Sequence, residues 1–287
     1  MIENGLLEQF VAFAKCGTLL KAAETLHITQ PSLSRSMKRI EEAFGVPLFH
    51  RENSKILLNE TGRVAAEYAE RALTANREMI DRVVSFDRSL HTIVVGSCAP
   101  LPIRELMPML QEHFAGMALT TEITGDEKLA ERLKGGQYQL VILRECPEDA
   151  LLVCQRYLEE RLYISLPQGH PLAQKKEVSF RDLDGISILT SGSSGFWLSL
   201  CKDKLRSSNL LIQSSADDMS ELVDASTLPV FNSDRMLERG YGAPGRVSLP
   251  ISDPEAHAIY YLACLASEQR RFEPVFSMVR ATALRGR

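Results

Sequence analysis

Apolar residues recur at intervals of three and four through the first 45 residues, in three short runs. This spacing predicts three helices, each of which buries one face against the others. Only His27 and Ile28 separate the second run from the third, so these two helices must meet at a sharp angle, as in a helix-turn-helix. The runs are Leu6, Phe10 and Phe13; Leu19, Ala22, Ala23 and Leu26; and Leu33, Met37, Ile40 and Phe44.

Residues that begin and end helices stand between these runs. Gly17 can end the first helix, over residues 3–16, and Thr18 can cap the second with its hydroxyl. Thr29 can cap the third helix, and Pro31 falls in its first turn, where a missing N–H costs nothing. The pattern therefore predicts a three-helix core whose helix ends are well defined.

The third helix leaves a donor-rich side outside this core, with no acid before Glu41. Arg and Gln can make bidentate hydrogen bonds to base edges in the major groove of B-DNA, while Ser, Thr and Lys hold phosphates. The pattern favours a DNA-recognition helix; for a cationic helix taken alone, a face that meets only solvent is the alternative. The donors are Gln30, Ser32, Ser34, Arg35, Lys38 and Arg39.

A hairpin and a long helix are expected next. Residues 46–58 hold a proline and two short apolar pieces, which is typical of a β-hairpin. Asn59 can cap a helix that runs to about Ser89. Its apolar stripe is too long for a small domain to bury, so we expect it to pack on its twin in a homodimer; packing on its own chain is the alternative. The stripe repeats every seven residues at Ala65, Ala72, Met79 and Phe86.

From Thr92 onward, β-like runs alternate with helical runs. This is typical of parallel sheets with crossover helices, and a chain that builds two such units and returns predicts two Rossmann-like lobes with a cleft between them. The expected strands are 92–97, 118–123, 139–143, 161–166, 186–191, 210–215, 227–231, 246–252 and 257–267. The expected helices are 102–114, 127–133, 196–206, 217–225 and 272–284.

Hydroxyls and backbone amides follow three of these strands, where a cleft ligand would bind. They suit a small carboxylate or a polar aromatic acid. For any single serine, a helix cap or turn is the alternative, and Arg144 and Glu145 are more typical of exposed loop charge. The candidate effector residues are Ser97, Cys98, Ala99 and Pro100; Thr124, Gly125 and Asp126; and Ser191, Gly192, Ser193 and Ser194.

The segment from Leu7 to Ala72 resembles the DNA-binding part of LysR-type transcriptional regulators. AAETLHITQPSLSRSMKRIE and GVPLFHR stand in that family's order without a gap, and PQGHPLA at residues 167–173 is similar to a piece of its effector domain. The resemblance implies an α/β fold class with an N-terminal winged helix-turn-helix, a long linker helix and a periplasmic-binding-protein-like effector domain of two Rossmann-like lobes. The implied domains are 1–58, 59–89 and 90–287, with lobe 1 at about 90–161 and 264–287 and lobe 2 at about 162–263.

The resemblance also assigns residues. It places Arg51 and Lys55 against the DNA backbone or minor groove, brings Thr18 near phosphate, and makes Asn232 a fourth wall of the effector site. Asn59 replaces the family's more usual Thr, and LVDASTLPVF lacks the glycines common before this strand, so the effector cannot be taken from a relative. The implied DNA-binding residues are Thr18, Thr29, Gln30, Pro31, Ser32, Ser34, Arg35, Lys38, Arg51 and Lys55.

These observations together predict a transcription regulator that responds to a small-molecule effector. We expect a homodimer or homotetramer that reads a pseudo-palindromic operator in double-stranded DNA, with RNA polymerase as a further candidate partner. Effector binding would alter the lobes and hence the bend or spacing of the DNA. The alternative is a small-molecule-sensing module that acts through protein contacts without DNA binding.

Composition bounds this prediction. The 287-residue chain has a net charge of −4, so DNA binding requires a local basic patch, and five cations outnumber three acids between Thr29 and Lys55. No basic leader opens the chain and no apolar run approaches ~20 residues, which favours a cytoplasmic protein with no membrane partner. Six scattered cysteines without a C-x-x-C pair favour free, mostly buried thiols, and no metal or cofactor is predicted. They are Cys16, Cys98, Cys146, Cys154, Cys201 and Cys264.

Short matches to enzyme motifs occur in the chain, but the secondary structure or partner residues that each motif requires are not predicted around them. GYGAPG at Gly240–Gly245 matches G-x-G-x-x-G by letter, but Pro244 and the alternating residues after it indicate a turn that enters a strand. SGSSGF presents Ser193 and Ser194 without the G-x-S-x-G pattern or a partner His. His170 precedes a proline in a loop and fits a turn better than a general base. We therefore predict that the protein is not an enzyme.

Overall fold

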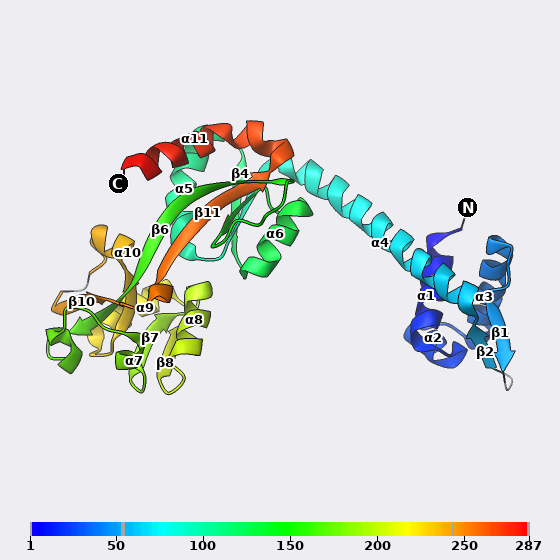
Figure 1. The fold of residues 1–287 in the computed structure, drawn as a ribbon, viewed down its shortest axis with the longest axis horizontal. Coiled ribbons are helices and arrows are strands. Elements are labelled where there is room, and N and C mark those ends of the chain that lie inside the picture. The colour runs from blue at the N-terminus through cyan, green and yellow to red at the C-terminus, as the bar shows by residue number, and fades with distance from the viewer. Residues whose placement is uncertain (1, 53–54, 243, 286–287) are drawn as a thin grey trace. The chain divides into compact units, whose positions relative to one another are not determined.

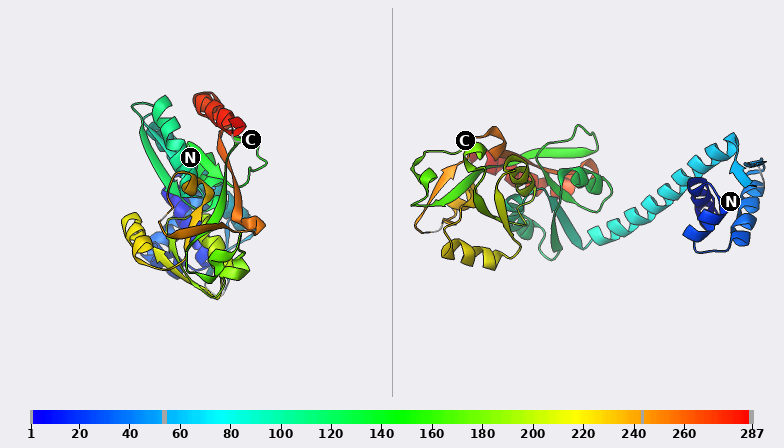
Figure 2. Two further views of the ribbon diagram at one scale, coloured as in Figure 1. Left: turned by 90° about the vertical axis from the view of Figure 1, so that its left-hand side faces the viewer. Right: turned by 90° about the horizontal axis from the view of Figure 1, so that it is seen from below.

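The computed structural model describes residues 2–52, 55–242 and 244–285, and the chain forms two compact units, residues 1–84 and 85–287 (Figure 1). Each unit has its own hydrophobic core, and Figure 2 gives two further views of the ribbon. Within the described residues, no helix is both long and apolar enough to span a lipid bilayer.

The first unit is a winged helix-turn-helix, as the apolar spacing predicts. Phe10, Leu33 and Met37 are completely enclosed between its helices. Phe49 attaches the hairpin to this core, because its ring centroid lies 6.0 Å from that of Phe10 and 5.7 Å from that of Phe13. The elements are α1 (Asn4–Cys16), α2 (Leu19–Thr25), α3 (Gln30–Phe44), β1 (Phe49–Glu52), β2 (Lys55–Leu58) and α4 (Glu60–Ser89), which continues into the second unit.

The predicted helix ends are confirmed. Thr18 Oγ1 accepts a hydrogen bond from the Lys21 N–H at 3.4 Å, and Thr29 Oγ1 accepts one from the Ser32 N–H at 3.3 Å. Gly17, predicted to end the first helix, ends α1 with φ 71°, and Gly45 ends α3 with φ 69°; both lie in the left-handed region that favours glycine. These caps fix where the donor-rich helix begins and ends.

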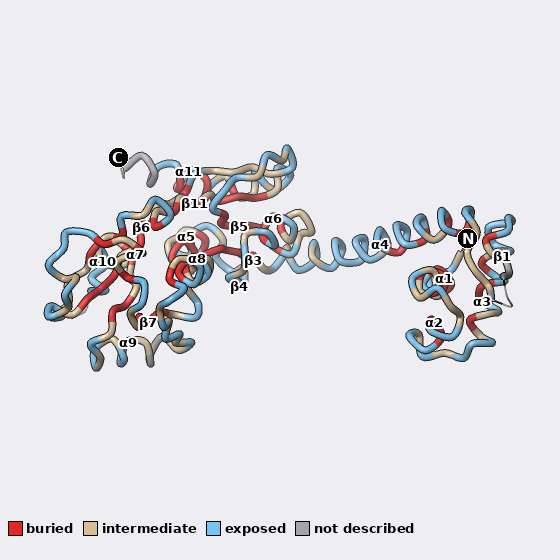
Figure 3. The backbone as a smooth tube through the Cα atoms, turned by 60° about the horizontal axis from the view of Figure 1, so that its bottom comes forward, coloured by how far each residue is buried: buried red, intermediate tan, exposed pale blue. Residues whose placement is uncertain are grey.

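Helix α4 buries only its first turns. Ala65, Ala69 and Leu73 pack into the core of the first unit, whereas Met79 and Val83 are 57% and 66% exposed. The middle turns of α4 are accordingly drawn in the colour of exposed residues in Figure 3. The two expectations for this helix therefore divide along its length: its start packs on its own chain, and its later apolar stripe lies uncovered.

The second unit is built on one nine-stranded sheet with the order β4-β3-β5-β11-β6-β9-β7-β8, in which β10 pairs with β6. Parallel pairs lie at both ends of this order, and β6, β10 and β11 are antiparallel to their partners. The strands are β3 (Thr92–Ser97), β4 (Ala118–Ile123), β5 (Leu140–Leu143), β6 (Leu152–Pro167), β7 (Ser187–Ser191), β8 (Asn209–Gln213), β9 (Val230–Ser233), β10 (Arg246–Pro250) and β11 (His257–Leu265).

The predicted helices connect these strands close to their expected bounds; they are α5 (Pro100–His113), α6 (Asp126–Lys134), α8 (Phe196–Lys204), α9 (Ala216–Ala225) and α11 (Gln269–Arg285). The short helices α7 (Phe180–Leu183) and α10 (Asp234–Glu238) and the 3-10 turns at Pro171–Gln174, Pro254–Ala256 and Ala266–Glu268 were not expected. The expected strand at 161–166 is too short, because β6 begins at Leu152 and pairs with nearly the whole of β11 before it reaches β9. Since most of residues 152–160 are only half-buried, they lack the apolar run of a core strand.

The prediction of free thiols is wrong for two cysteines. Cys146, in the loop after β5, and Cys154, in β6, form a disulfide with a Cα–Cα separation of 6.1 Å. Cys16, Cys98, Cys201 and Cys264 are free, and the last three are buried. Spacing along the chain could not predict the bond, because the pairing depends on how the two ends of this loop are placed by the sheet.

Candidate nucleic-acid interface and effector cleft

The donor-rich side of α3 is open to solvent. Gln30, Arg35 and Lys38 are exposed, while Leu33 and Met37 on the opposite side are fully buried. Neither Arg35 nor Lys38 makes a hydrogen bond or ion pair with the described residues, whereas Arg39 lies 3.8 Å from Glu3. Two long cationic side chains are thus held on a rigid helix with their donors available to another molecule.

The other predicted DNA-binding residues fall around this face. Thr29 and Pro31 are exposed at the start of α3, and Ser32 and Ser34 are half-buried beside them. Thr18 is half-buried at the start of α2. The backbones of Arg51 and Lys55 lie in β1 and β2, and their side chains are outside the described part of the structure.

Glu41 connects the recognition helix to the wing, and the sequence analysis did not identify it. Its Oε1 accepts hydrogen bonds from the Leu48 N–H at 2.7 Å and the Phe49 N–H at 3.2 Å. Asn59 holds the same segment from α4, since its Nδ2 donates to the Pro47 carbonyl at 2.8 Å and its Oδ1 accepts from the Gly62 N–H at 2.7 Å. An acid in the last turn of a predicted helix, eight residues before a predicted strand, was the available signal.

Gly62 allows this close packing. A Cβ at Gly62 would lie 2.1 Å from the Leu48 carbonyl oxygen, a separation that no side chain tolerates. The start of α4 can therefore approach the base of the wing only with glycine at this position. The recognition helix, the wing and α4 are joined at one point, residues 47–49.

In the second unit, the end of β3 meets the start of α8. The Phe196 N–H donates to the Cys98 carbonyl at 2.9 Å, and Gly195 adopts φ 63°. A Cβ at Gly195 would lie 2.1 Å from that carbonyl oxygen. Ser97 and Ala99 are buried here, and Ser97 Oγ donates to the Ala99 carbonyl at 2.7 Å, so this hydroxyl stabilises its own turn. The two lobes, one built on the parallel strands β3, β4 and β5 and the other on β7, β8 and β9, are therefore in direct backbone contact.

Arg144 lies at the same place. It is an exposed loop charge, as expected, but its guanidinium is paired instead of meeting only solvent. Its Nε donates to Asp126 Oδ2 at 2.6 Å, and its guanidinium carbon lies 4.4 Å from the centroid of the Phe196 ring. The guanidinium thus links α6, β5 and α8 through one ion pair and one cation–π contact. Its position after β5, at the carboxyl edge of parallel strands, was the signal in the sequence.

The remaining predicted effector residues do not all join this cluster. Thr124 is half-buried and its N–H donates to the Ser97 carbonyl at 3.0 Å, and Pro100 begins α5. The Ser191 and Ser193 hydroxyl oxygens contact each other at 2.9 Å. Asn232 lies inside β9 instead of after it, and its Nδ2 donates to the Tyr241 carbonyl at 3.0 Å.

A buried carboxylate lies beside the contact between the lobes. Glu160, on β6, is 4% exposed, and its Oε2 accepts hydrogen bonds from Tyr260 at 2.6 Å and the Trp197 Nε1–H at 3.0 Å. Burial raises the pKa of Glu160 above its usual value despite these donors. Strands β6 and β11 thus hold α8 through a polar group in an otherwise apolar region.

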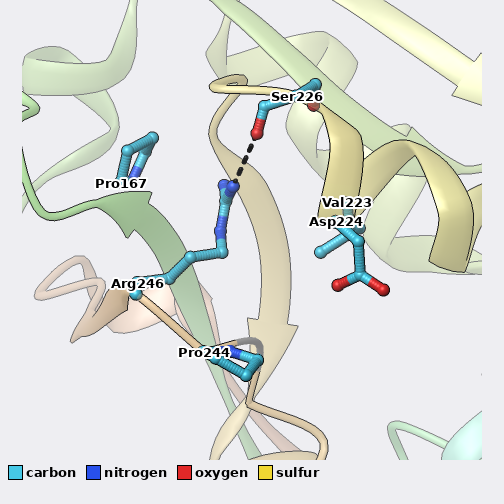
Figure 4. A pocket seen from close by; sticks show the side chains of 7 residues that line it. Pro167, Val223, Asp224, Ser226, Pro244 and Arg246 are labelled. Carbon is cyan, nitrogen blue, oxygen red and sulfur yellow. Dashed lines mark hydrogen bonds between the residues drawn. The ribbon is translucent and has the colours of Figure 1, made fainter.

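A pocket of about 400 Å³ lies at the end of β6, beside the start of β10. Pro167, Val223, Asp224, Ser226, Pro244, Gly245 and Arg246 line it (Figure 4). Arg246 does not present a free cation there, because its guanidinium donates to the Ser165 hydroxyl and to the Ser165, Ser226 and Leu228 carbonyls. No predicted effector residue lines this pocket. Its one arginine holds strand β10 to β6 and to residues 226–228 through hydrogen bonds.

Known families match both units. A model described as "Bacterial regulatory helix-turn-helix protein, lysR family" matches residues 5–63, and one described as "LysR substrate binding domain" matches residues 87–282. Among curated proteins, the chain is 27% identical over 180 residues to the RuBisCO operon transcriptional regulator of Allochromatium vinosum, covering 62% of this chain and 60% of that protein. It therefore spans less than two thirds of that relative's length.

Two further similarities extend over most of the chain. The DNA-binding transcriptional dual regulator OxyR of Escherichia coli (strain K12) is 23% identical over 270 residues, which are 92% of this chain and 86% of OxyR. A full-length OxyR variant from Pseudomonas aeruginosa is similar in structure, with a TM-score of 0.52, 21% identity, and coverage of 98% of this chain and 95% of that chain. The structural similarity establishes the fold, and the two family models, which together match nearly the whole sequence, show that the chain belongs to the LysR family of bacterial transcriptional regulators.

Proposed function

We propose that the protein is a homodimeric or homotetrameric regulator whose paired α3 helices enter successive major grooves of a pseudo-palindromic operator. The observation that carries this proposal is the face of α3 on which Arg35 and Lys38 are exposed without a partner among the described residues. Cations of this kind contact base edges and phosphates. Residues 1–58 would form the DNA-binding domain, residues 59–89 the linker helix, and residues 90–287 the effector domain.

The apolar stripe of α4 supports the oligomer. Tyr68, Met79, Val83 and Phe86 are between 57% and 66% exposed on one side of a continuous helix. An uncovered stripe at heptad spacing is stable in water when a second helix packs against it. Two copies joined in this way would double the basic surface and match the symmetry of a palindromic site.

We place the effector at the contact between the lobes, where Cys98, Asp126, Arg144 and Phe196 converge. Arg144 supports a ligand with a carboxylate, since a guanidinium that exchanges Asp126 for a ligand carboxylate keeps its charge paired. Bacterial DNA is cytoplasmic, so we assign the regulator to that compartment. RNA polymerase is a proposed partner, and we assign no enzymatic reaction to the cleft.

The test is a binding titration with the DNA that flanks the protein's own gene and with random DNA of equal length. Operator binding at least ~1,000-fold tighter than random binding would support the proposal. Equal affinities would contradict it and favour a sensing module that acts through protein contacts. A thermal-shift screen of small carboxylic acids, with and without Arg144→Ala, would test the effector separately.

A further inference from the structure

Cys146 and Cys154 differ from the three buried cysteines in position and chemistry, and Cys16 is half-buried and free. Cys98, Cys201 and Cys264 are buried, and burial raises the pKa of both the Cys201 and the Cys264 thiol to about 12, so these thiols stay protonated. Cys146 is exposed and Cys154 is half-buried, and the structure bonds them to each other. Thiol chemistry is therefore accessible at this pair and suppressed at the buried sites.

The disulfide between Cys146 and Cys154 closes a loop that begins two residues after Arg144, which contacts Phe196 at the contact between the lobes. Cys146 follows two residues after Arg144, which pairs with Asp126 and lies over Phe196. Cys154 lies near the start of β6, where it is paired with Ala263 of β11. Within the loop, Asp149 accepts a hydrogen bond from Lys134 Nζ at 3.1 Å. The disulfide therefore ties the segment that carries Arg144 to strand β6 and restrains its movement.

We propose that Cys146 and Cys154 are a reversible modification site, oxidised by low-molecular-weight disulfides and reduced by thiols, and that its state controls how firmly Arg144 is held against Phe196. In oxidation the Cys146 thiolate attacks the reagent disulfide, forms a mixed disulfide and releases one thiol. The Cys154 thiolate then attacks Cys146 Sγ and releases the second thiol. The protein loses two electrons and two protons, and the reagent gains both.

Trypsin makes the site directly measurable. It cuts after Arg144 and Arg156, so both cysteines fall in the peptide 145–156. The full chain is equilibrated with mixtures of oxidised and reduced dithiothreitol, alkylated and digested, and the peptides are identified by mass spectrometry. We expect this peptide to lose both alkylation sites together at one ratio, while the free Cys16 thiol stays alkylated. Both cysteines alkylated at every ratio, in folded protein, would overturn the proposal.

Trp197, the chain's single tryptophan, reports the second half of the proposal. It follows Phe196, and the two ring centroids lie 4.4 Å apart. We expect reduction to shift Trp197 emission in the wild-type protein and in Cys16→Ser, and to leave Cys146→Ser unchanged. Arg144→Ala should show the shifted spectrum in both redox states. Identical wild-type spectra before and after reduction would overturn the coupling, independently of DNA binding.

Discussion

The two units carry their candidate sites in different ways. In the first, a single helix presents Arg35 and Lys38 from one side while it buries Leu33 and Met37 on the other, so the site is a property of fifteen consecutive residues. In the second, Cys98, Asp126, Arg144 and Phe196 come from four separate elements and meet through backbone and ion-pair contacts. A site on one helix is robust to changes elsewhere, and a site between lobes depends on how its elements are placed.

The largest effect is expected where the first unit depends on a second copy. Val83→Glu places a charge on the exposed apolar stripe of α4 and should separate the dimer, which lowers operator affinity by about 100-fold because the half-sites then bind independently. Sedimentation and DNA titration check both results. Arg77→Glu, on the opposite side of the helix, is the matched control; equal loss in the two variants would argue against an α4 interface.

Arg35→Ala should have the next largest effect, because it removes a donor from the α3 face. A bidentate base contact contributes about 1–3 kcal/mol of discrimination, so operator affinity should fall roughly 10- to 100-fold with little change on random DNA. Arg51→Ala should weaken binding to both DNAs and reduce the salt slope by about 1. The site assignment for Arg35 fails if specific and random binding fall equally.

Glu41→Ala tests whether the wing is positioned by the recognition helix. The variant leaves the Leu48 and Phe49 N–H groups without their acceptor, which costs about 1–3 kcal/mol and should weaken DNA binding several-fold. Glu41→Gln keeps an acceptor oxygen and should restore most of the affinity. Glu42→Ala, at the exposed neighbouring acid, should have no effect on titrations; a Glu41→Gln variant as weak as Glu41→Ala would contradict the hydrogen-bonding role.

Gly195→Ala tests the contact between the lobes in the second unit. An added Cβ cannot fit 2.1 Å from the Cys98 carbonyl and would be strained at φ 63°, so the contact should open at a cost of about 1–3 kcal/mol. We expect a lower Tm and a shifted Trp197 emission. The affinity for DNA should be unchanged, because the DNA-binding face of α3 lies in the first unit. Gly169→Ala, where an added Cβ meets nothing within 4 Å, is the control.

The smallest effect is expected for Glu160→Gln and depends on pH. The pKa of Glu160 is raised in the folded state, so at neutral pH the folded protein carries the cost of an ionised buried group; this cost falls as the pH drops below the folded-state pKa and is gone below the unfolded-state pKa of about 4.3. The variant should be as stable as the wild type, or more so, at pH 7.5, and its advantage should be lost at pH 4. Thermal unfolding at both pH values checks this; destabilisation at pH 7.5 would contradict it.

The difference between the units also explains what could be predicted. The helix-turn-helix, its caps at Thr18, Thr29 and Asn59, and most strands of the second unit follow from local spacing, because helix faces and caps depend on residues three or four apart. Glu41, Arg144 and Gly195 were missed or underestimated because their partners are distant in the chain or lie on other elements. The disulfide between Cys146 and Cys154 was missed for the same reason.

By itself, the sequence determined the elements, the family and the donor-rich face of α3, since each rests on the identity and order of neighbouring residues. Only the tertiary structure decided that Ala65 and Leu73 are buried while Val83 is exposed, and that Arg144 pairs with Asp126 and lies against the face of the Phe196 ring. Burial and pairing depend on which surfaces the folded chain brings together, and one-dimensional spacing carries no information about contacts between remote segments.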